Sequence, residues 1–354
     1  MVGESSCGRT AWLLAAVLAG VLLTAHGPAW ATIQISTATG GLTVSAGPSM
    51  AFGNVNGLGV GTRTSGLSLL TTGVANGVLY ATPYNIILSG FQSGHTMSVT
   101  AYVRTSFGHP AILVAESCQV GASCSVAANF TTISSNSGSP TPVTSSNIPN
   151  STVTASLGIF VSASNGAGTF TGSDTVQIRF TATDVNNGST STANLTITIT
   201  VQQAVQLQLS TATGGLTIAP ASDFSANFGS VNGLGIFPAS GLSVVAASGG
   251  VIYSTPYRIT PSFSSFTTTT GTVKAYVSAN FAHSAILALN DAPAAAGPYS
   301  AISKSSGSPT VFTTSAASAA DITRYLGLFT SNVNGASAFT GADTATLTYT
   351  LTVP

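Results

Sequence analysis

Two histidines in matching sequence contexts are the first candidates for chemistry. His109 lies in segment 107–113 (FGHPAIL) and His283 in segment 281–287 (FAHSAIL), whereas His95 has no counterpart. An imidazole can act as a base or as a metal ligand, but a zinc site needs about four clustered nitrogen or sulfur ligands. No such cluster surrounds these histidines in the sequence. We therefore expect His109 and His283 to lie at loop–strand junctions and to hydrogen-bond the backbone.

The carboxylates are few and scattered. Asp174 and Asp343 each follow a Phe-Thr-Gly-x sequence and precede a strand-like segment. Each could pair with arginine or bind calcium, but calcium takes 6–8 oxygens from several groups, so we expect each to cap its own turn. Glu116 has no matching acid in the other half of the chain, whereas glycoside hydrolysis needs two carboxylates in one cleft. With neither a nucleophile elbow nor a phosphate-binding loop, we expect no enzyme activity, no cofactor and no metal.

Aromatic side chains offer the remaining ligand chemistry. The motif Tyr-x-Thr-Pro-Tyr occurs twice and contains Tyr80 and Tyr84 in one copy and Tyr253 and Tyr257 in the other. Paired exposed rings could bind a sugar, so a glycan-binding or other surface-ligand-binding module is the alternative function. Burial of tyrosine with a bonded hydroxyl is the more common arrangement. Rings side by side on an open face would favour sugar binding, and burial would favour a structural role.

The cysteines indicate one local crosslink. Cys118 and Cys124, six positions apart, are the cysteines that follow the N-terminal segment. In an oxidising compartment such a pair predicts a disulfide that closes a short loop, with free thiols as the alternative.

The N-terminal segment 1–31 has the pattern of a secretory signal peptide. Arg9 precedes an apolar run over residues 11–23, and small residues lead to an Ala-x-Ala sequence that ends at Ala31. The apolar run is shorter than the roughly 20 residues that a membrane anchor needs. We expect cleavage after Ala31, no later membrane-spanning segment, and a protein that is secreted or otherwise outside the cytoplasm.

Low charge limits the classes of partner. Only 5% of the residues are charged and the formal net charge is zero, against about 25% charged residues in ordinary globular proteins. Because neutralising phosphates takes clustered lysine and arginine, nucleic acid is a poor candidate partner. Hydrophobic residues make up 44% of the chain, which argues against disorder.

A long internal repeat organises the rest of the sequence. Segment 36–43 (STATGGLT) recurs as segment 210–217, and further motifs recur at a similar separation of about 170 residues, which is the size of a whole domain. We predict two copies of one module, at residues 32–202 and 203–354, after the signal peptide at residues 1–31.

Alternating polarity predicts an all-β fold for both copies. Segment 194–202 (NLTITITVQ) places Leu195, Ile197, Ile199 and Val201 on one face and threonines on the other. Short alternating segments separated by Asn-Gly turns are typical of a β-sandwich. We therefore predict two tandem immunoglobulin-like β-sandwich domains.

One strand differs between the copies. Segment 194–201 has no counterpart in copy two before Pro354. It belongs to copy one alone or it completes a sheet of copy two. An unfilled position would leave a sheet edge, and exposed edges accept strands from other chains. We expect copy two to offer an edge for assembly, with Leu195, Ile197, Ile199 and Val201 as the candidate assembly strand; an edge capped by its own loops is the alternative.

Three recurring features carry a family resemblance: an early Phe-Gly, the Tyr-x-Thr-Pro-Tyr strand, and a closing Phe-Thr-Gly-x-Asp-Thr strand. In these the chain resembles bacterial secreted domains of the spore-coat-U and chaperone–usher pilin type. The resemblance implies an immunoglobulin-like fold and a structural role at the cell surface. We thus expect a secreted or cell-surface structural or adhesive protein whose partners are itself or other surface proteins.

Overall fold

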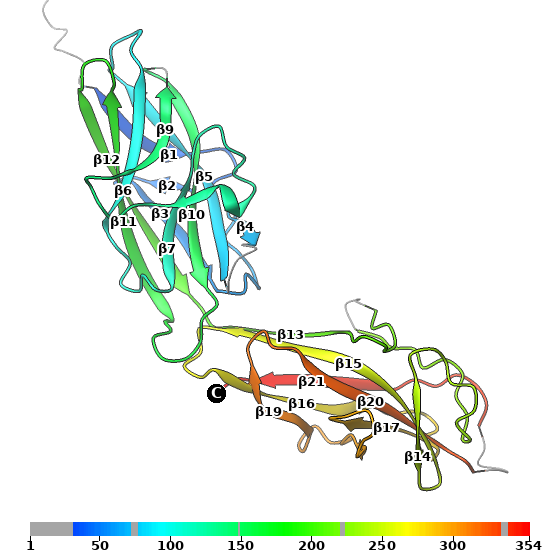
Figure 1. Ribbon diagram of the computed structural model, residues 1–354. Helices are drawn as coiled ribbons and strands as arrows, with labels where there is room; N and C mark the ends of the chain where they lie inside the picture. Colours follow the sequence, from blue (N-terminus) through cyan, green and yellow to red (C-terminus); the bar gives the residue numbers. More distant parts are fainter. Residues whose placement is uncertain (1–30, 72–76, 148, 220–223, 334–338) are drawn as a thin grey trace, which may run out of the picture.

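Strands make up nearly all of the regular structure (Figure 1). The computed structural model describes residues 31–71, 77–147, 149–219, 224–333 and 339–354, and in these ranges its only helix is the 3-10 turn η1 (Ala127–Asn129). Strands β1 to β12 form two sheets and strands β13 to β21 form two others, with no pairing between the sets in the described ranges. We call these sets the first and the second module. The predicted all-β fold of two tandem sandwiches is confirmed.

The first module consists of two six-stranded sheets. In one sheet every pairing is antiparallel, and the order is β1 (Thr32–Thr37), β5 (Gly77–Ser89), β10 (Thr152–Ser162), β7 (Leu113–Cys118) and β8 (Phe130–Thr132), with β4 (Ser68–Thr71) also on β5. In the other the order is β2 (Val44–Ser45), β3 (Ser49–Val55), β12 (Thr190–Val201), β11 (Gly172–Asp184), β6 (Met97–Thr105) and β9 (Thr141–Asn147). Strand β12 runs antiparallel to β11 and parallel to β3.

The second module has one sheet of the same order and one smaller sheet. The first is β13 (Ala204–Thr211), β15 (Gly250–Ser264), β20 (Ile322–Ser331), β17 (Leu287–Ala292) and β18 (Ser300–Ala301), with β14 (Ser243–Ala247) also on β15. The smaller sheet has three strands, β19 (Thr310–Ala317), β16 (Thr270–Ala279) and β21 (Thr346–Thr352). These three occupy the places of β9, β6 and β11.

Period-two alternation builds the core of the first module. Because successive side chains of a strand point to opposite faces, one face of β12 meets the core while its threonines lie on the other face. The inward residues of β11 are equally buried, with Ile178 and Phe180 fully inaccessible to solvent. The ring of Phe180 lies 5.6 Å from that of Tyr84 on the opposite sheet, so the sheets pack face to face through large apolar side chains.

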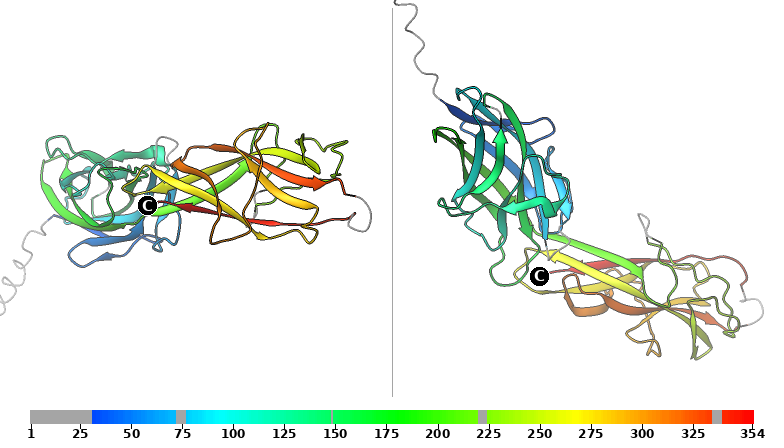
Figure 2. Two further views of the ribbon diagram at one scale, coloured as in Figure 1. Left: turned by 90° about the horizontal axis from the view of Figure 1, so that it is seen from below. Right: turned by 45° about the horizontal axis from the view of Figure 1, so that its top comes forward.

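The modules lie end to end and touch through two turns (Figures 1 and 2). The turn between β10 and β11 contributes Asn165, whose Nδ2 donates to the Phe263 carbonyl at 2.7 Å and whose Oδ1 accepts from the Phe266 N–H at 3.1 Å. The Gly166 N–H also donates to the Phe266 carbonyl at 2.8 Å. Gly166 has a φ of +96°, and a Cβ at this position would come within 3.0 Å of Thr269, so glycine permits this close approach.

Residues 1–30 of the predicted signal peptide lie outside the described residues. In the ranges that the structure describes, no helix is long and apolar enough to cross a membrane.

Candidate functional site

Asp174 gathers hydrogen-bond donors from a distant loop. Its carboxylate accepts the N–H groups of Gly108 and His109, each at 3.0 Å, and that of Thr175 at 2.7 Å. His109 Nδ1 lies 3.0 Å from Asp174 Oδ2, and the imidazole stacks on the Phe170 ring at a centroid distance of 3.7 Å. An ionised carboxylate only accepts hydrogen bonds, so Nδ1 carries the proton. The three side chains fasten the loop before β7 to the start of β11.

The second module repeats this Phe–His–Asp cluster. Asp343 accepts the N–H groups of Ala282 at 3.0 Å, His283 at 2.9 Å and Thr344 at 2.8 Å. His283 Nδ1 lies 3.0 Å from Asp343 Oδ2, and the imidazole stacks on Phe339 at 3.6 Å. The repetition of every contact indicates a structural clamp that both modules use.

Hydrogen bonding favours the ionised form of both aspartates. Burial alone would raise each pKa, but the hydrogen bonds outweigh it. The donors from Gly108, His109 and Thr175 hold the pKa of Asp174 below its usual value. In the second module, the donors from His283, Ala282 and Thr344 lower the pKa of Asp343 to about 2.

These contacts revise two expectations. We expected each aspartate to cap its own turn, and Asp174 does accept the N–H of Thr175, but it also holds a loop 65 residues away. We expected the His109 and His283 side chains to hydrogen-bond the backbone, which is wrong because each Nδ1 faces a carboxylate. His95 is similar, with Nδ1 2.7 Å from Oδ2 of the buried Asp184. The recurrence of Phe-x-His and Phe-Thr-Gly-x-Asp in both copies was the sequence signal for this pairing.

Among the described residues, no three His, Cys, Asp or Glu side chains cluster closely enough to hold an ion. Glu116 lies on β7 opposite Gly158 and Thr132, and burial raises the pKa of its carboxyl. Of the candidate residues, His109, His283, Asp174 and Asp343 are engaged in the two clamps.

The four tyrosines of the candidate ligand face are buried. Tyr80, Tyr84, Tyr253 and Tyr257 are each at most 2% exposed. The Tyr80 hydroxyl donates to the Asn56 carbonyl at 2.9 Å and accepts the Asn56 N–H at 3.0 Å, and Tyr253 binds Asn232 in the same way. The rings form no exposed platform for a sugar because the alternation of β5 and β15 turns them into the core.

The predicted disulfide is present. Cys118, at the end of β7, is bonded to Cys124, with 5.8 Å between their Cα atoms. Cys118 is fully buried and Cys124 packs beside it against a small apolar cluster that includes Leu79 and Phe130. The crosslink thereby holds the loop between β7 and η1 against the outer side of the first sheet.

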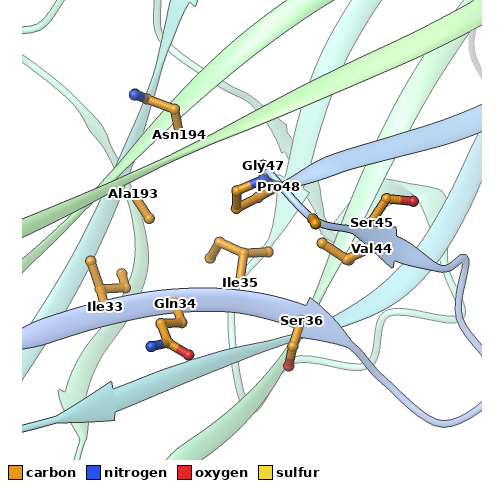
Figure 3. Close-up of a pocket in the computed structure, with 11 residues that line it drawn as sticks. Ile33, Gln34, Ile35, Ser36, Val44, Ser45, Gly47, Pro48, Ala193 and Asn194 are labelled. Carbon is orange, nitrogen blue, oxygen red and sulfur yellow. The ribbon is translucent and has the colours of Figure 1, made fainter.

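A shallow hollow opens at one margin of the first module (Figure 3). It measures about 520 Å³ and lies between β1 and the β2–β3 hairpin. Ile35, Val44 and Pro48 supply its apolar wall, and Ala193 and Asn194 close it from β12. No charged side chain lines the hollow, so it offers shape and apolar contact but no acid–base group.

The clearest difference between the modules lies along β21. In the first module, β11 pairs with β6 on one side and with β12 on the other. In the second module, β21 pairs with β16, and no strand of the described residues pairs with its other edge. Within the described residues, that edge of β21 is therefore an edge of its sheet.

Burial on the two strands differs accordingly. Ile178 and Phe180 of β11 are fully buried, whereas Leu347 and Tyr349, at the matching places of β21, are only partly buried. The same difference is found on the other side of the place that β12 fills. Phe52 on β3, the strand that pairs with β12 on that side, is fully buried, whereas its counterpart Phe228 is partly exposed. The apolar side chains on both sides of the place that β12 fills in the first module are thus less covered in the second, and we call this place the groove beside β21.

Strand β12 fills that place in the first module. Its inward side chains, each at most 1% exposed, are Leu195, Ile197, Ile199 and Val201. The sequence left two alternatives open: the segment belongs to copy one alone, or it completes a sheet of copy two. In the structure it lies in a sheet of the first module, between β3 and β11. The segment is a central strand of that sheet and does not complete a sheet of the second module.

Comparison with known proteins finds similar solved structures but no matching family model. No protein-family model matches the sequence, and no curated protein matches it. Among solved structures, the chain is similar to the CooA pilin subunit of enterotoxigenic Escherichia coli, with 15% identity, a TM-score of 0.25, and coverage of 48% of this chain and 99% of that one. It is also similar to a chaperone–tip adhesion subunit complex, CsuC–CsuE, of Acinetobacter baumannii, with 10% identity, a TM-score of 0.32, and coverage of 91% and 100%. It is similar as well to the CupB6 tip adhesin of Pseudomonas aeruginosa, with 11% identity, a TM-score of 0.31, and coverage of 90% of this chain and 94% of that one.

The solved structures to which the chain is similar thus include pilin and tip-adhesin subunits, the kind of domain that its sequence resembles. Because the overlays are loose, what this chain does must be argued from its own geometry.

Proposed function

We propose that this protein is an exported structural or adhesive subunit that assembles by accepting a strand along the free edge of β21. The single observation that carries the proposal is the contrast between β11, which has β12 beside it, and β21, which has a partner on one side in the described residues. The groove beside β21 is apolar and only partly covered, which suits an extended apolar segment.

The first module specifies what the added strand should look like. Strand β12 runs antiparallel to β11 and buries every second side chain. The partner of β21 should be an extended segment with about four apolar residues at alternate positions and polar residues between them. Its backbone would supply affinity through main-chain hydrogen bonds, and its alternating side chains would supply specificity. The natural donor is a surface-protein subunit, either another copy or a different chain.

The matching parts of the modules support an origin by duplication, with residues 32–202 as one unit and 203–354 as the other. Both have a Phe–His–Asp clamp and a tyrosine hydroxyl that binds the Asn-Gly loop. These contacts use the repeated motifs as structural fasteners, which favours a non-catalytic role. Export through a leader at residues 1–31 would bring the protein to the compartment in which the Cys118–Cys124 disulfide is stable.

A strand-complementation experiment tests the proposal. The test peptide has the sequence of residues 193–202, which includes all four inward side chains of β12. We expect it to bind the full chain and to raise the midpoint of thermal unfolding of the second module. A ligand at 100 times its Kd adds about 2.7 kcal/mol of stability.

The matched control is a peptide of the same composition in a scrambled order that destroys the alternation. If neither peptide binds, or if both bind equally well, β21 does not accept a strand in the manner of β11.

A further inference from the structure

One loop of the second module exposes a compact group of large apolar side chains. Within residues 232–237, which we call the distal loop, Leu234 is 72% exposed, Ile236 52% and Phe237 91%. Val244 of β14 lies beneath the loop, since a Cβ on Gly235 would come within 2.6 Å of its Cγ1. We call these four apolar residues the distal patch. Contiguous exposed apolar groups of this kind mark interaction surfaces.

The distal loop is held in one conformation by hydrogen bonds. Asn232 Oδ1 accepts the N–H groups of Leu234 and Ile236, and its Nδ2 donates to the Ile236 carbonyl at 2.7 Å. The buried hydroxyl of Tyr253 binds both the N–H and the carbonyl of Asn232, each at 2.9 Å. The apolar side chains are thus presented on a preorganised support, which lowers the entropy lost when a partner binds.

Phe237 stands where the first module has a glycine. The segment Leu-Gly-Val-Gly that ends at Gly61 matches Leu-Gly-Ile-Phe that ends at Phe237. Both residues have a positive φ, +87° for Gly61 and +58° for Phe237. This backbone region is unfavourable for a residue with a side chain, typically by about 1 kcal/mol. A strained and almost fully exposed phenylalanine does not stabilise its own module, which points to a role in contact with a partner.

The path of the chain in the first module identifies where that partner lies. Strand β12 ends beside β3, where the Gln202 N–H donates to the Val55 carbonyl at 2.8 Å. The next module begins at once with β13 at Ala204. The module that follows the strand therefore starts next to Val55 and the Asn56 loop. The places that match Val55 and Asn56 in the second module are Val231 and Asn232, at the base of the distal loop.

We infer that the distal patch is a contact surface for the β-sandwich subunit whose strand fills the groove along β21. The inference rests on the proposed function and on an incoming strand oriented like β12. That orientation brings the body of the donor subunit against Leu234, Ile236 and Phe237. The strand and the patch then form two adjoining parts of one interface, and the apolar side chains are covered on assembly.

Two binding experiments distinguish contact at the distal patch from strand addition alone. The first arm measures the affinity of the free 193–202 peptide for the full chain. The second uses a full chain in which residues 190–204 are placed directly ahead of Ala31, so that a strand is followed by a β-sandwich at the spacing found between β12 and β13. Its head-to-tail association is followed by sedimentation velocity.

The test variant is Phe237→Gly, which restores the residue of the first module and relieves the positive φ, so the fold should be retained or slightly stabilised. We expect the affinity of the Phe237→Gly chain for the peptide to stay within about twofold of the wild-type value, because the free peptide has no attached β-sandwich that could contact the distal patch. We expect head-to-tail association to weaken about tenfold, the loss typical of an aromatic at the centre of an interface. The control Val311→Ser removes a half-exposed apolar side chain from β19, which lies on the other side of β16 from β21, and should change neither arm.

Three results would overturn the inference. Unchanged association of the Phe237→Gly chain, with normal peptide binding, would show that strand addition occurs without contact at the patch. An equal loss in both arms would place Phe237 within the strand groove. Absence of peptide binding to the unmodified chain would remove the proposed function and the inference together.

Discussion

Asn165 of the first module and Phe263 of the second are 98 residues apart in sequence and are joined by a hydrogen bond of 2.7 Å from Asn165 Nδ2 to the Phe263 carbonyl. The same amide accepts the N–H of Phe266. One side chain thus satisfies two backbone groups of the neighbouring module and holds the two sandwiches in a defined relation.

Asn165→Ala should loosen this joint. The Phe266 N–H loses its side-chain partner and the Phe263 carbonyl keeps only the bond from the Ser318 hydroxyl, which we expect to cost about 1–2 kcal/mol. Small-angle scattering should report a broader distribution of overall dimensions. Asn136→Ala is the control because Asn136 makes its contacts within its own loop, for example with the Gly138 N–H. Scattering curves that superimpose for wild type and Asn165→Ala would show that other contacts fix the joint.

Truncation of matching core residues should reveal the open groove. Ile178 on β11 is fully buried, and Leu347 at the matching place on β21 is only partly buried. Ile178→Ala should cost about 2–5 kcal/mol of unfolding free energy, and Leu347→Ala about half as much, because solvent already reaches that side chain. Denaturant unfolding measures both values. Equal losses would mean that the groove beside β21 is as well packed as the core of the first module.

Acid should weaken the Phe–His–Asp clamps. The pKa of Asp343 is lowered from 3.8 to about 2 in the folded protein, so its contribution to stability is present above about pH 4 and is lost as the pH falls towards 2. Asp343→Asn should therefore destabilise the protein most at neutral pH, and the difference from wild type should shrink below pH 4. The exposed Asp321 gives the control Asp321→Asn. A difference that stays constant from pH 7 to pH 2 would contradict the clamp.

Arg324 should be needed to keep Asp291 buried. Arg324 Nη2 pairs with Asp291 Oδ2, and the guanidinium lies 5.1 Å from the centre of the Phe312 ring. Burial raises the pKa of Asp291, so the ionised carboxylate is costly at this position unless the Arg324 guanidinium pairs with it. Arg324→Ala should cost about 3–5 kcal/mol, and the double variant Arg324→Met with Asp291→Leu should recover most of this loss. Thermal unfolding of the three proteins measures the effect, and an Arg324→Ala protein as stable as wild type would show that the pair is dispensable.

Local patterns in the sequence predicted the elements well, because alternation and turn residues act over a few positions. Leu195 to Val201 were expected to alternate inward and do so, and Cys118 was expected to bond Cys124. Contacts across long separations were missed. The pairing of His109 with Asp174 joins two loops that are 65 residues apart in sequence, so only the recurrence of both motifs in the two copies, and no pattern within either motif, could have indicated it.

The inter-module joint was missed for a similar reason. Asn165-Gly166 is one of the Asn-Gly pairs that predict turns between strands, but its contact with Phe266 depends on how the two modules dock. The free edge of β21 was an expectation from the repeat, since comparing the copies showed a strand without a counterpart. Its apolar surroundings, in particular the exposure of Phe237, depend on packing that the sequence does not display.

Hydrogen exchange along β21, with and without the 193–202 peptide, tests strand addition most directly. The backbone amides of residues 346–352 that face away from β16 should exchange rapidly in the free chain. On saturation with the peptide they should become protected, while the amides of β11 stay unchanged. Rapid exchange of those β21 amides at saturating peptide, or protection confined to another edge, would contradict the account.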